Sequence, residues 1–330
     1  MKTSNLNLLF FFFLLAGSLF LTSCENEDNF IPYEKSQSFN YSRTKAITAL
    51  KDLPSEPFRF EIFSDWGGPF FFPDESVIEF KAGSFLLNGV PVSNKFVQVE
   101  VTLVRNKSQV VGNLLSTTSG DKLIESGGMV NVRAFCDGKE LTLDPDKGYT
   151  LKLSVPGGNF NPAMELFYGE ETDTGINWSE ADNDPKTQNN IFLSEWTRDS
   201  SGRQVIGMEC FPKKFGWVNC DFFSKLNDKP LTNPCFIPHG PSNGDTVDLQ
   251  AFAVFKNYLM IIQPCCVENK DEICFGPLPI GEPVYYLIIG KGKQDYYLGY
   301  VEKNVESDEK VVINLSVKSL QEVKDFLANL

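Results

Sequence analysis

The sequence contains a single histidine, His239, among 330 residues. It lies in Pro238-His239-Gly240-Pro241, a turn bounded by proline and glycine with no nucleophile motif beside it. Ser-His-Asp and Cys-His hydrolases relay protons through an imidazole, so this scarcity argues against both classes. Glycine-rich phosphate-binding motifs and the zinc motif H-E-x-x-H are also absent from the sequence. No catalytic signature therefore stands out.

Basic residues are in the minority. Thirty Lys and Arg face 43 Asp and Glu, which gives a formal net charge of −13. Such a surface repels phosphate backbones, so we expect no nucleic-acid partner. Phenylalanine is abundant, with 29 residues, and glycine and proline are frequent. This composition suits short strands joined by turns.

Long apolar runs are absent beyond the N-terminal stretch Leu8–Leu21. As a helix this stretch would reach about 21 Å, which is short of the roughly 30 Å hydrocarbon core. Lys2 precedes it and Leu21-Thr22-Ser23-Cys24 follows, which is the layout of a secretory signal peptide over residues 1–23. These last four residues resemble a bacterial lipobox, which implies that Cys24 is acylated. An uncleaved anchor and an ordinary signal peptide with a coincidental cysteine are the alternatives.

The segment after Cys24 is polar and begins with the acidic cluster Glu25-Asn26-Glu27-Asp28. We interpret residues 24–57 as a tether between a lipid anchor and the first domain, with a short helix near Lys45–Lys51. The acidic cluster resembles the surface-export signal of Bacteroidetes lipoproteins, although a solvated linker has the same composition. We therefore expect a lipid-anchored protein of the outer membrane, and both the cell surface and the periplasmic leaflet remain open as its location.

Alternation of apolar and polar residues dominates the next part of the chain. Residues 58–63, 97–104 and 149–155 each alternate with a period of two, which is typical of half-buried strands. Asn88-Gly89 and Asp137-Gly138 are dipeptides that favour tight hairpin turns. The pattern predicts a mainly β protein built from sandwich-like domains.

Residues 169–204 break this rhythm because they are acidic and poor in apolar residues. We expect them to form a linker between one β domain at 58–168 and a second at 205–330. Near the end, Ser319 and Glu322 have the spacing of a capping box and precede an amphipathic stretch. This predicts a short C-terminal helix that packs on the second domain.

Several short segments of the sequence resemble a group of Bacteroidetes cell-surface lipoproteins of unknown function, whose N-terminal module is similar to the ZU5 β domain. The segments are Val77–Phe85, Glu125–Met129, Gly138–Leu141, Met164–Gly169, Gly175–Trp178 and Gly216–Asp221. The resemblance implies a β-sandwich interaction module at 58–168. Some ZU5 domains cleave themselves at a His-Phe/Ser step. Gly240 follows His239 here, so the resemblance does not imply that activity.

Aromatic residues cluster in the stretch Trp66-Gly67-Gly68-Pro69-Phe70-Phe71-Phe72-Pro73. Its rings could form an exposed apolar rim for a polymer or a protein, and burial of alternate rings is the competing interpretation. We select Trp66, Phe70 and Phe72 as candidate binding residues. Trp178, which lies in the acidic segment 169–204, is the fourth candidate binding residue. The alternative for it is a position in the core.

Two acidic segments offer oxygen ligands for calcium, namely Asp144–Gly148 and Glu180–Asp184. Neither matches the twelve-residue calcium loop, and solvated turns explain both segments. We expect no cofactor.

Cysteine accounts for eight residues, seven of them after Cys24. Export favours disulfides, and we expect Cys274 to bond with Cys265 or Cys266, with Cys266–Cys274 as the selected pair. The remaining adjacent cysteine would pair elsewhere, with Cys235 for example, or stay reduced. A zinc site is disfavoured because the chain has no C-x-x-C pair.

Two functions from different classes remain open at this point. The favoured one is a non-catalytic surface module that binds an envelope protein or a polysaccharide. The alternative is a surface hydrolase that uses two carboxylates, and its only support is the abundance of Asp and Glu.

Overall fold

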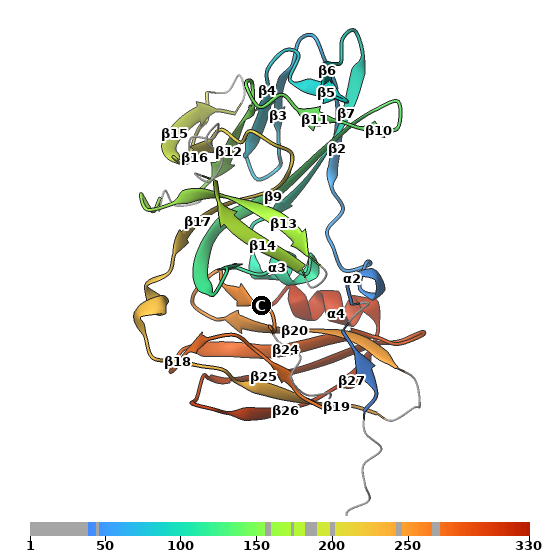
Figure 1. Cartoon of the computed structure of the whole chain (residues 1–330), viewed down its shortest axis with the longest axis vertical. Helices are drawn as coiled ribbons and strands as arrows, with labels where there is room; N and C mark the ends of the chain where they lie inside the picture. Colours follow the sequence, from blue (N-terminus) through green and yellow to red (C-terminus); the bar gives the residue numbers. More distant parts are fainter. Residues whose placement is uncertain are drawn as a thin grey trace, which may run out of the picture. The chain divides into compact units, whose positions relative to one another are not determined.

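Antiparallel strands make up most of the computed structural model (Figure 1). The structure describes residues 39–43, 46–155, 160–172, 175–181, 190–198, 202–241, 246–265 and 271–330, which all belong to one unit, Phe39–Leu330. The predicted signal peptide and Cys24 lie outside these residues. No helix within the described ranges is long and apolar enough to cross a bilayer. The expectation of a mainly β protein is confirmed.

The larger sheet has the strand order β14-β13-β17-β9-β7-β2. All its pairings are antiparallel. The short strands β8 (Thr118–Ser119) and β10 (Lys139–Glu140) also pair with β9. The strands are β2 (Phe58–Phe63), β7 (Phe96–Val104), β9 (Lys122–Cys136), β13 (Glu165–Thr172), β14 (Gly175–Glu180) and β17 (Gly216–Phe223).

A second sheet faces the first one and has the order β15-β16-β12-β4-β3. Its strands are β3 (Gly68–Phe71), β4 (Val77–Phe80), β12 (Tyr149–Ser154), β15 (Phe192–Thr197) and β16 (Gln204–Cys210). Buried side chains of both sheets, such as Val99, Val132 and Leu151, form one apolar core between them. This two-layer arrangement buries one face of each alternating strand.

Hairpin turns occur where the two dipeptides predict them. Asn88 and Gly89 both have positive φ and join β5 (Phe85–Leu87) to β6 (Val90–Pro91). Asp137 and Gly138 also have positive φ, and they join β9 to β10. The strand β11 (Thr142–Leu143) completes a small sheet of order β11-β5-β6.

The C-terminal part forms a separate sheet of order β1-β20-β24-β25-β27, with β21 paired to β20. Strands β20 and β24 and the first half of β25 are mostly buried, because both faces of the sheet are covered there. Phe252 and Val254 face one apolar cluster, whereas Ala253 and Phe255 face another. The strands are β1 (Tyr41–Ser42), β20 (Val247–Phe255), β21 (Ile261–Ile262), β24 (Pro283–Lys291), β25 (Tyr296–Asn304) and β27 (Ser316–Lys318).

One face of this sheet is covered by short strands. The three-stranded sheet β22-β19-β26 contains a parallel pair, β19 with β26. The covering elements are β18 (Leu231–Thr232), β19 (Cys235–His239), β22 (Ile273–Cys274), β23 (Leu278–Pro279), β26 (Lys310–Asn314) and the 3-10 helix η3 (Lys225–Asp228).

Helix α4 (Leu320–Leu327) covers the other face of the C-terminal sheet, as Figure 1 shows. Its capping box is present: the Ser319 hydroxyl accepts from the Glu322 backbone N–H, and the Glu322 carboxylate accepts from the Ser319 N–H. Val323 and Leu327 are buried against residues of the sheet. The predicted C-terminal helix and its packing are therefore confirmed.

The expected linker at 169–204 differs from the structure. Residues 175–180 form β14 and residues 192–197 form β15, each at an edge of one sandwich sheet. The strands β16 and β17, expected in the second domain, also belong to the sandwich. The expectation failed because edge strands expose much of their surface to solvent and so carry fewer apolar residues.

The expected tether at 24–57 also differs from the structure in its last part. Tyr41 and Ser42 form β1, which pairs in parallel with β20. Helix α2 (Ala46–Ala49) follows, within the stretch where the sequence predicts a short helix, and Leu50 and Leu53 are buried after it. The described residues 39–43 and 46–57 therefore belong to the folded unit, where strand β1 pairs with β20 and the two leucines are buried.

The sandwich and the C-terminal sheet share an apolar cluster. Thr117 donates its backbone N–H to the Ile261 carbonyl at 2.7 Å, and Ile261 N–H donates to the Thr117 hydroxyl at 2.8 Å. Trp178 and Phe252 lie in the same buried cluster. Helix α3 (Lys107–Gly112), which follows β7, contributes Val110 and Val111 to it.

Candidate functional site

Three neighbouring aromatic side chains lie at one end of the larger sandwich sheet. Phe63 ends β2, Phe96 begins β7, and the two residues pair directly across the strands. Trp66 follows in the turn after β2. Its ring centroid lies 4.8 Å from that of Phe63, which in turn lies 5.2 Å from that of Phe96. We call Phe63, Trp66 and Phe96 the aromatic face.

The aromatic face is exposed to solvent. Trp66 has a relative exposure of 78% and Phe96 of 63%, while Phe63 is half-buried beneath them. The rings are tilted by 52° and 66° to one another, so they form a raised group rather than a flat platform. An exposed tryptophan that contacts one large apolar ring, which in turn contacts a second exposed ring, is typical of an interaction site rather than of ordinary surface.

A tight turn holds Trp66 outward. The backbone N–H groups of Trp66 and Gly67 both donate to the Phe63 carbonyl, at 3.1 and 3.0 Å. Gly67 has a φ of +64°, and a Cβ atom there would lie 2.2 Å from the Phe80 carbonyl oxygen. Only glycine fits such a position, so the turn depends on it.

Hydrogen bonds connect this turn to the loop before β7. The Asp65 carboxylate accepts from the Asn94 backbone N–H at 3.0 Å and from the Ser93 hydroxyl at 3.3 Å. Ser64 is fully buried, and its N–H donates to the Lys95 carbonyl at 2.9 Å. The two segments that carry the aromatic face are therefore fixed relative to each other, which lowers the entropic cost of binding.

The four candidate binding residues have different fates. Trp66 is exposed, as a binding residue must be. Phe70 is half-buried and stacks on Phe60 at 4.0 Å, which makes it a support rather than a contact surface. Phe72 and Trp178 are each 1% exposed, so their selection as binding residues was wrong. Phe72 directly follows β3 and lies in the core between the sheets, and the Trp178 indole donates to the Ser116 carbonyl at 2.7 Å.

Phe63 and Phe96 were missed by the sequence reasoning, although a signal existed. Ile62 and Val97 are buried core residues, so their neighbours Phe63 and Phe96 must point to the opposite face of the sheet. The alternation of side chains along β2 and β7 therefore places Phe63 and Phe96 on the face that points away from the core.

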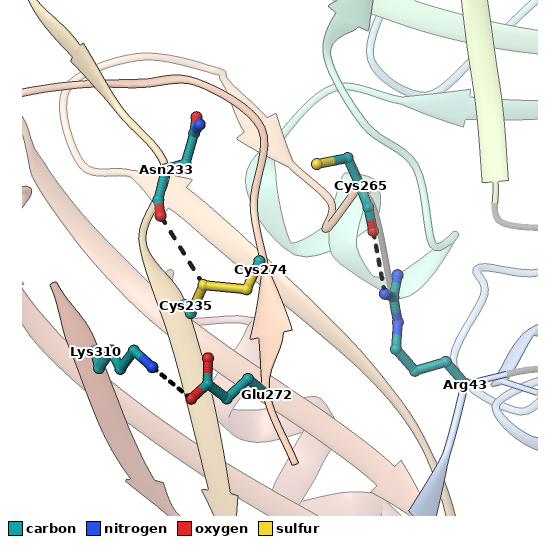
Figure 2. The surroundings of a disulfide bond; sticks show 7 residues. All are labelled: Arg43, Asn233, Cys235, Cys265, Glu272, Cys274 and Lys310. Carbon is teal, nitrogen blue, oxygen red and sulfur yellow. Dashed lines mark hydrogen bonds and ion pairs between the residues drawn. A yellow bond between two sulfur atoms is a disulfide. The ribbon is translucent and has the colours of Figure 1, made fainter. Parts of the chain in front are cut away.

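The cysteine pairing also differs from the expectation. Cys274 bonds to Cys235, its direct partner across β22 and β19, as Figure 2 shows. The expected bond from Cys274 to Cys265 or Cys266 is therefore wrong, since a cysteine forms one disulfide. Strand pairing brings Cys235 and Cys274 together despite their separation of 39 residues. Cys266 lies outside the described residues, and Cys265 is exposed, with its backbone carbonyl accepting a hydrogen bond from the Arg43 guanidinium.

The disulfide also bears on metal binding. Cys235, Glu272 and Cys274 place their ligand atoms within 4.8 Å of one another. The disulfide removes both thiolates, however, and the Glu272 carboxylate pairs with the Lys310 ammonium at 2.7 Å (Figure 2). This cluster does not fit a zinc ion, which needs free thiolate ligands.

The acidic segments considered for calcium have separate outcomes. In the first, the Asp144 carboxylate accepts from the Asp146 backbone N–H at 3.0 Å, and the Gly148 N–H donates to the Asp144 carbonyl at 2.9 Å. These contacts are those of a turn. In the second, residues 182–184 lie outside the described part of the chain.

A buried polar cluster lies where β9 carries a bulge, with one extra residue opposite β17. Ser126 donates to the Asn219 side-chain oxygen at 2.8 Å, and the Asn219 amide donates to the Asp221 carboxyl. Asp221 is fully buried, and this burial raises its pKa well above its ordinary value. Burial also raises the pKa of Glu125, on the neighbouring strand. The cluster is enclosed, so it offers no access to a substrate.

A depression of about 550 Å³ lies beside α4 and α3 and includes Asp52, Glu56 and Lys324 in its lining. Asp52 accepts a hydrogen bond from the Tyr296 hydroxyl at 3.0 Å, and burial raises the pKa of Tyr296 to about 12. Both carboxylates are exposed, whereas a general acid needs burial or a like charge to raise its pKa. The depression therefore lends no specific support to a hydrolase.

Comparison of the chain with protein families, curated proteins and solved structures finds no match. The resemblance to Bacteroidetes surface lipoproteins with a ZU5-like module stays a prediction from the sequence.

Proposed function

We propose that this chain is a non-catalytic binding module that is lipid-anchored at Cys24 in the outer membrane and binds a protein partner in the cell envelope. The aromatic face is the binding surface. Trp66 carries the proposal because it is 78% exposed in a turn whose backbone is fixed by hydrogen bonds. The predicted lipobox, the sequence resemblance and the lack of a catalytic constellation in the sequence support the same function.

The shape of the aromatic face favours a protein over a polysaccharide as the partner. A sugar ring stacks best on a flat ring surface, whereas Phe63, Trp66 and Phe96 are mutually tilted. A raised tryptophan fits an apolar pocket, and tryptophan is enriched among the residues that dominate the affinity of protein interfaces. Residues around it supply polar groups for the rim of such an interface.

The test is site-specific photo-crosslinking in intact cells that make the full chain. A photoreactive phenylalanine analogue at position 96 should yield one dominant adduct, and Trp66→Ala should strongly reduce its yield. Burial of the indole is worth at least about 2 kcal/mol at such a site, so affinity should fall by about thirtyfold. Phe192 serves as the control position because it is 46% exposed on a different sheet.

Two results would overturn the protein partner. One is an adduct from position 96 that survives Trp66→Ala with unreduced yield or that also forms from position 192. The other comes from affinity electrophoresis in gels that contain cell-surface polysaccharide. Retardation of the wild-type chain that is lost in Trp66→Ala but kept in Phe192→Ala would make the partner a polysaccharide.

A further inference from the structure

Two cysteines face each other inside the sandwich. Cys210 ends β16 in one sheet, Cys220 lies in β17 of the other, and their sulfur atoms are 3.8 Å apart. Each is 1% exposed and belongs to the apolar core between the sheets. The chain crosses from one sheet to the other between them, through residues 211–215.

We propose that Cys210 and Cys220 form a second disulfide, one that joins the two sheets of the sandwich. The sulfur atoms need to approach by about 1.8 Å to reach bonding distance. The Cys235–Cys274 bond indicates a chain suited to an oxidising compartment. This modification is independent of the aromatic face and of any partner bound there.

The bond forms by thiol–disulfide exchange. One thiolate attacks the disulfide of an oxidant, either a dithiol oxidase of the envelope or glutathione disulfide, and displaces one of its sulfurs as a thiolate. The second cysteine thiolate then attacks the mixed disulfide and releases the other sulfur. Two electrons pass to the oxidant, which leaves as two thiols, and the two cysteine protons are transferred with them.

The burial of the two cysteines determines when, relative to folding, this reaction can occur. The contact between the two thiols and their burial raise the pKa of Cys210 well above its usual range. The attacking species is the thiolate, so the folded sandwich suppresses the reaction. Exchange therefore occurs while the chain folds, before the two sheets close over the cysteines. Once closed, the core also protects the bond from reductants.

The decisive measurement maps disulfides in the refolded full chain. The reduced protein is unfolded in guanidinium chloride, refolded in glutathione redox buffer, alkylated under denaturing conditions and digested with trypsin. Lys213 and Lys214 lie between the two cysteines, so the bond would appear as peptide 204–213 linked to peptide 215–225. The Cys235–Cys274 link in the same sample shows that oxidation took place.

We expect this linked pair in most molecules that carry the Cys235–Cys274 bond. Cys136→Ala should leave it unchanged, because Cys136 is a buried free thiol elsewhere in the sandwich. Alkylation of both Cys210 and Cys220 in chains that contain the Cys235–Cys274 bond would overturn the proposal, as would pairing of either residue with a different cysteine. Because the wild-type chain decides the matter, the test does not depend on the folding of a variant.

Discussion

At the scale of single residues, the buried carboxyl group of Asp221 lowers the free energy of unfolding at pH values where an exposed carboxyl group is charged. It lies in a polar cluster with Ser126 and Asn219 inside an otherwise apolar region, and its burial disfavours the charged form. The folded chain therefore holds a proton on Asp221 at pH values where the unfolded chain releases it. Of the three residues in the cluster, Asp221 is the one whose ionisation makes the free energy of unfolding depend on pH.

Asp221→Asn tests this dependence. The unfolded carboxyl has a pKa of about 3.9, and the folded value is raised, so the folded state binds more protons above about pH 4. The free energy of unfolding of the wild type should then fall as the pH rises above about 4. The amide does not titrate, so the variant should gain stability relative to the wild type as the pH rises.

Guanidinium chloride unfolding at several pH values provides the measurement. Asp121→Asn is the matched control because Asp121 is exposed, and its pH profile should follow the wild type. Equal profiles for the Asp221→Asn variant and the wild type would contradict the account.

Exposure at the residue scale was only partly predictable. The sequence singled out Trp66 because glycines and aromatic residues surround it, but it also selected Phe72 and Trp178, which the core absorbs. Whether a tryptophan is buried depends on which sheets face each other, and composition does not contain that information. Phe63 and Phe96 could be found only by following the phase of alternation across two strands.

At the scale of elements, local features were predictable and non-local ones were not. The turn at Asn88-Gly89 and the capping box of α4 each depend on a few consecutive residues, and both occur as predicted. The Cys235–Cys274 bond depends on the pairing of β19 with β22, which joins distant segments. Sequence reasoning favoured a short loop from Cys265 or Cys266 because proximity along the chain was the only distance available to it.

The turn that carries Trp66 gives a prediction at this scale. Gly67→Ala combines a positive φ, which costs about 1–2 kcal/mol, with a Cβ atom 2.2 Å from the Phe80 carbonyl oxygen. We expect a loss of about 3 kcal/mol or more in the free energy of unfolding, together with displacement of Trp66. Thermal and denaturant unfolding measure the loss, and solute quenching of fluorescence reports on the exposed indole.

Gly89→Ala is the control for this turn. Gly89 also has a positive φ, of +80°, but a Cβ atom there would meet nothing within 4 Å. Its cost should stay at about 1–2 kcal/mol. Equal losses in the two variants would show that backbone conformation, and not the close approach to Phe80, governs the turn.

At the scale of the whole molecule, the division of the chain was the least predictable feature. The sandwich extends to Phe223, and residues 39–57 join the C-terminal sheet through the parallel pairing of β1 with β20. The pairing partners Tyr41 and Val247 are more than two hundred residues apart, and neither segment indicates the other. Polar edge strands also gave residues 169–204 the composition of a linker.

Localisation is the property of the whole molecule that the proposal most depends on. Cys24→Ala removes the only side chain that the predicted lipobox offers for acylation. The variant should leave the outer-membrane fraction and appear as soluble or as unprocessed inner-membrane protein, because stable anchoring needs acyl chains. Cell fractionation with immunoblotting measures this, and Cys136→Ala should fractionate like the wild type. Normal outer-membrane recovery of Cys24→Ala would contradict the anchor.

The placement of β1 separates the beginning of the folded unit from the aromatic face. The chain enters the folded unit at the edge of the C-terminal sheet, whereas Phe96 opens β7 at the far end of the sandwich. From Phe96 to Val104 the strand spans about 27 Å, and α3 beyond it touches the C-terminal part through Lys107 and Lys256. Tyr41 and Val247 thus join the beginning of the folded unit to the C-terminal sheet, and the aromatic face is held by a separate strand pairing, that of β2 with β7.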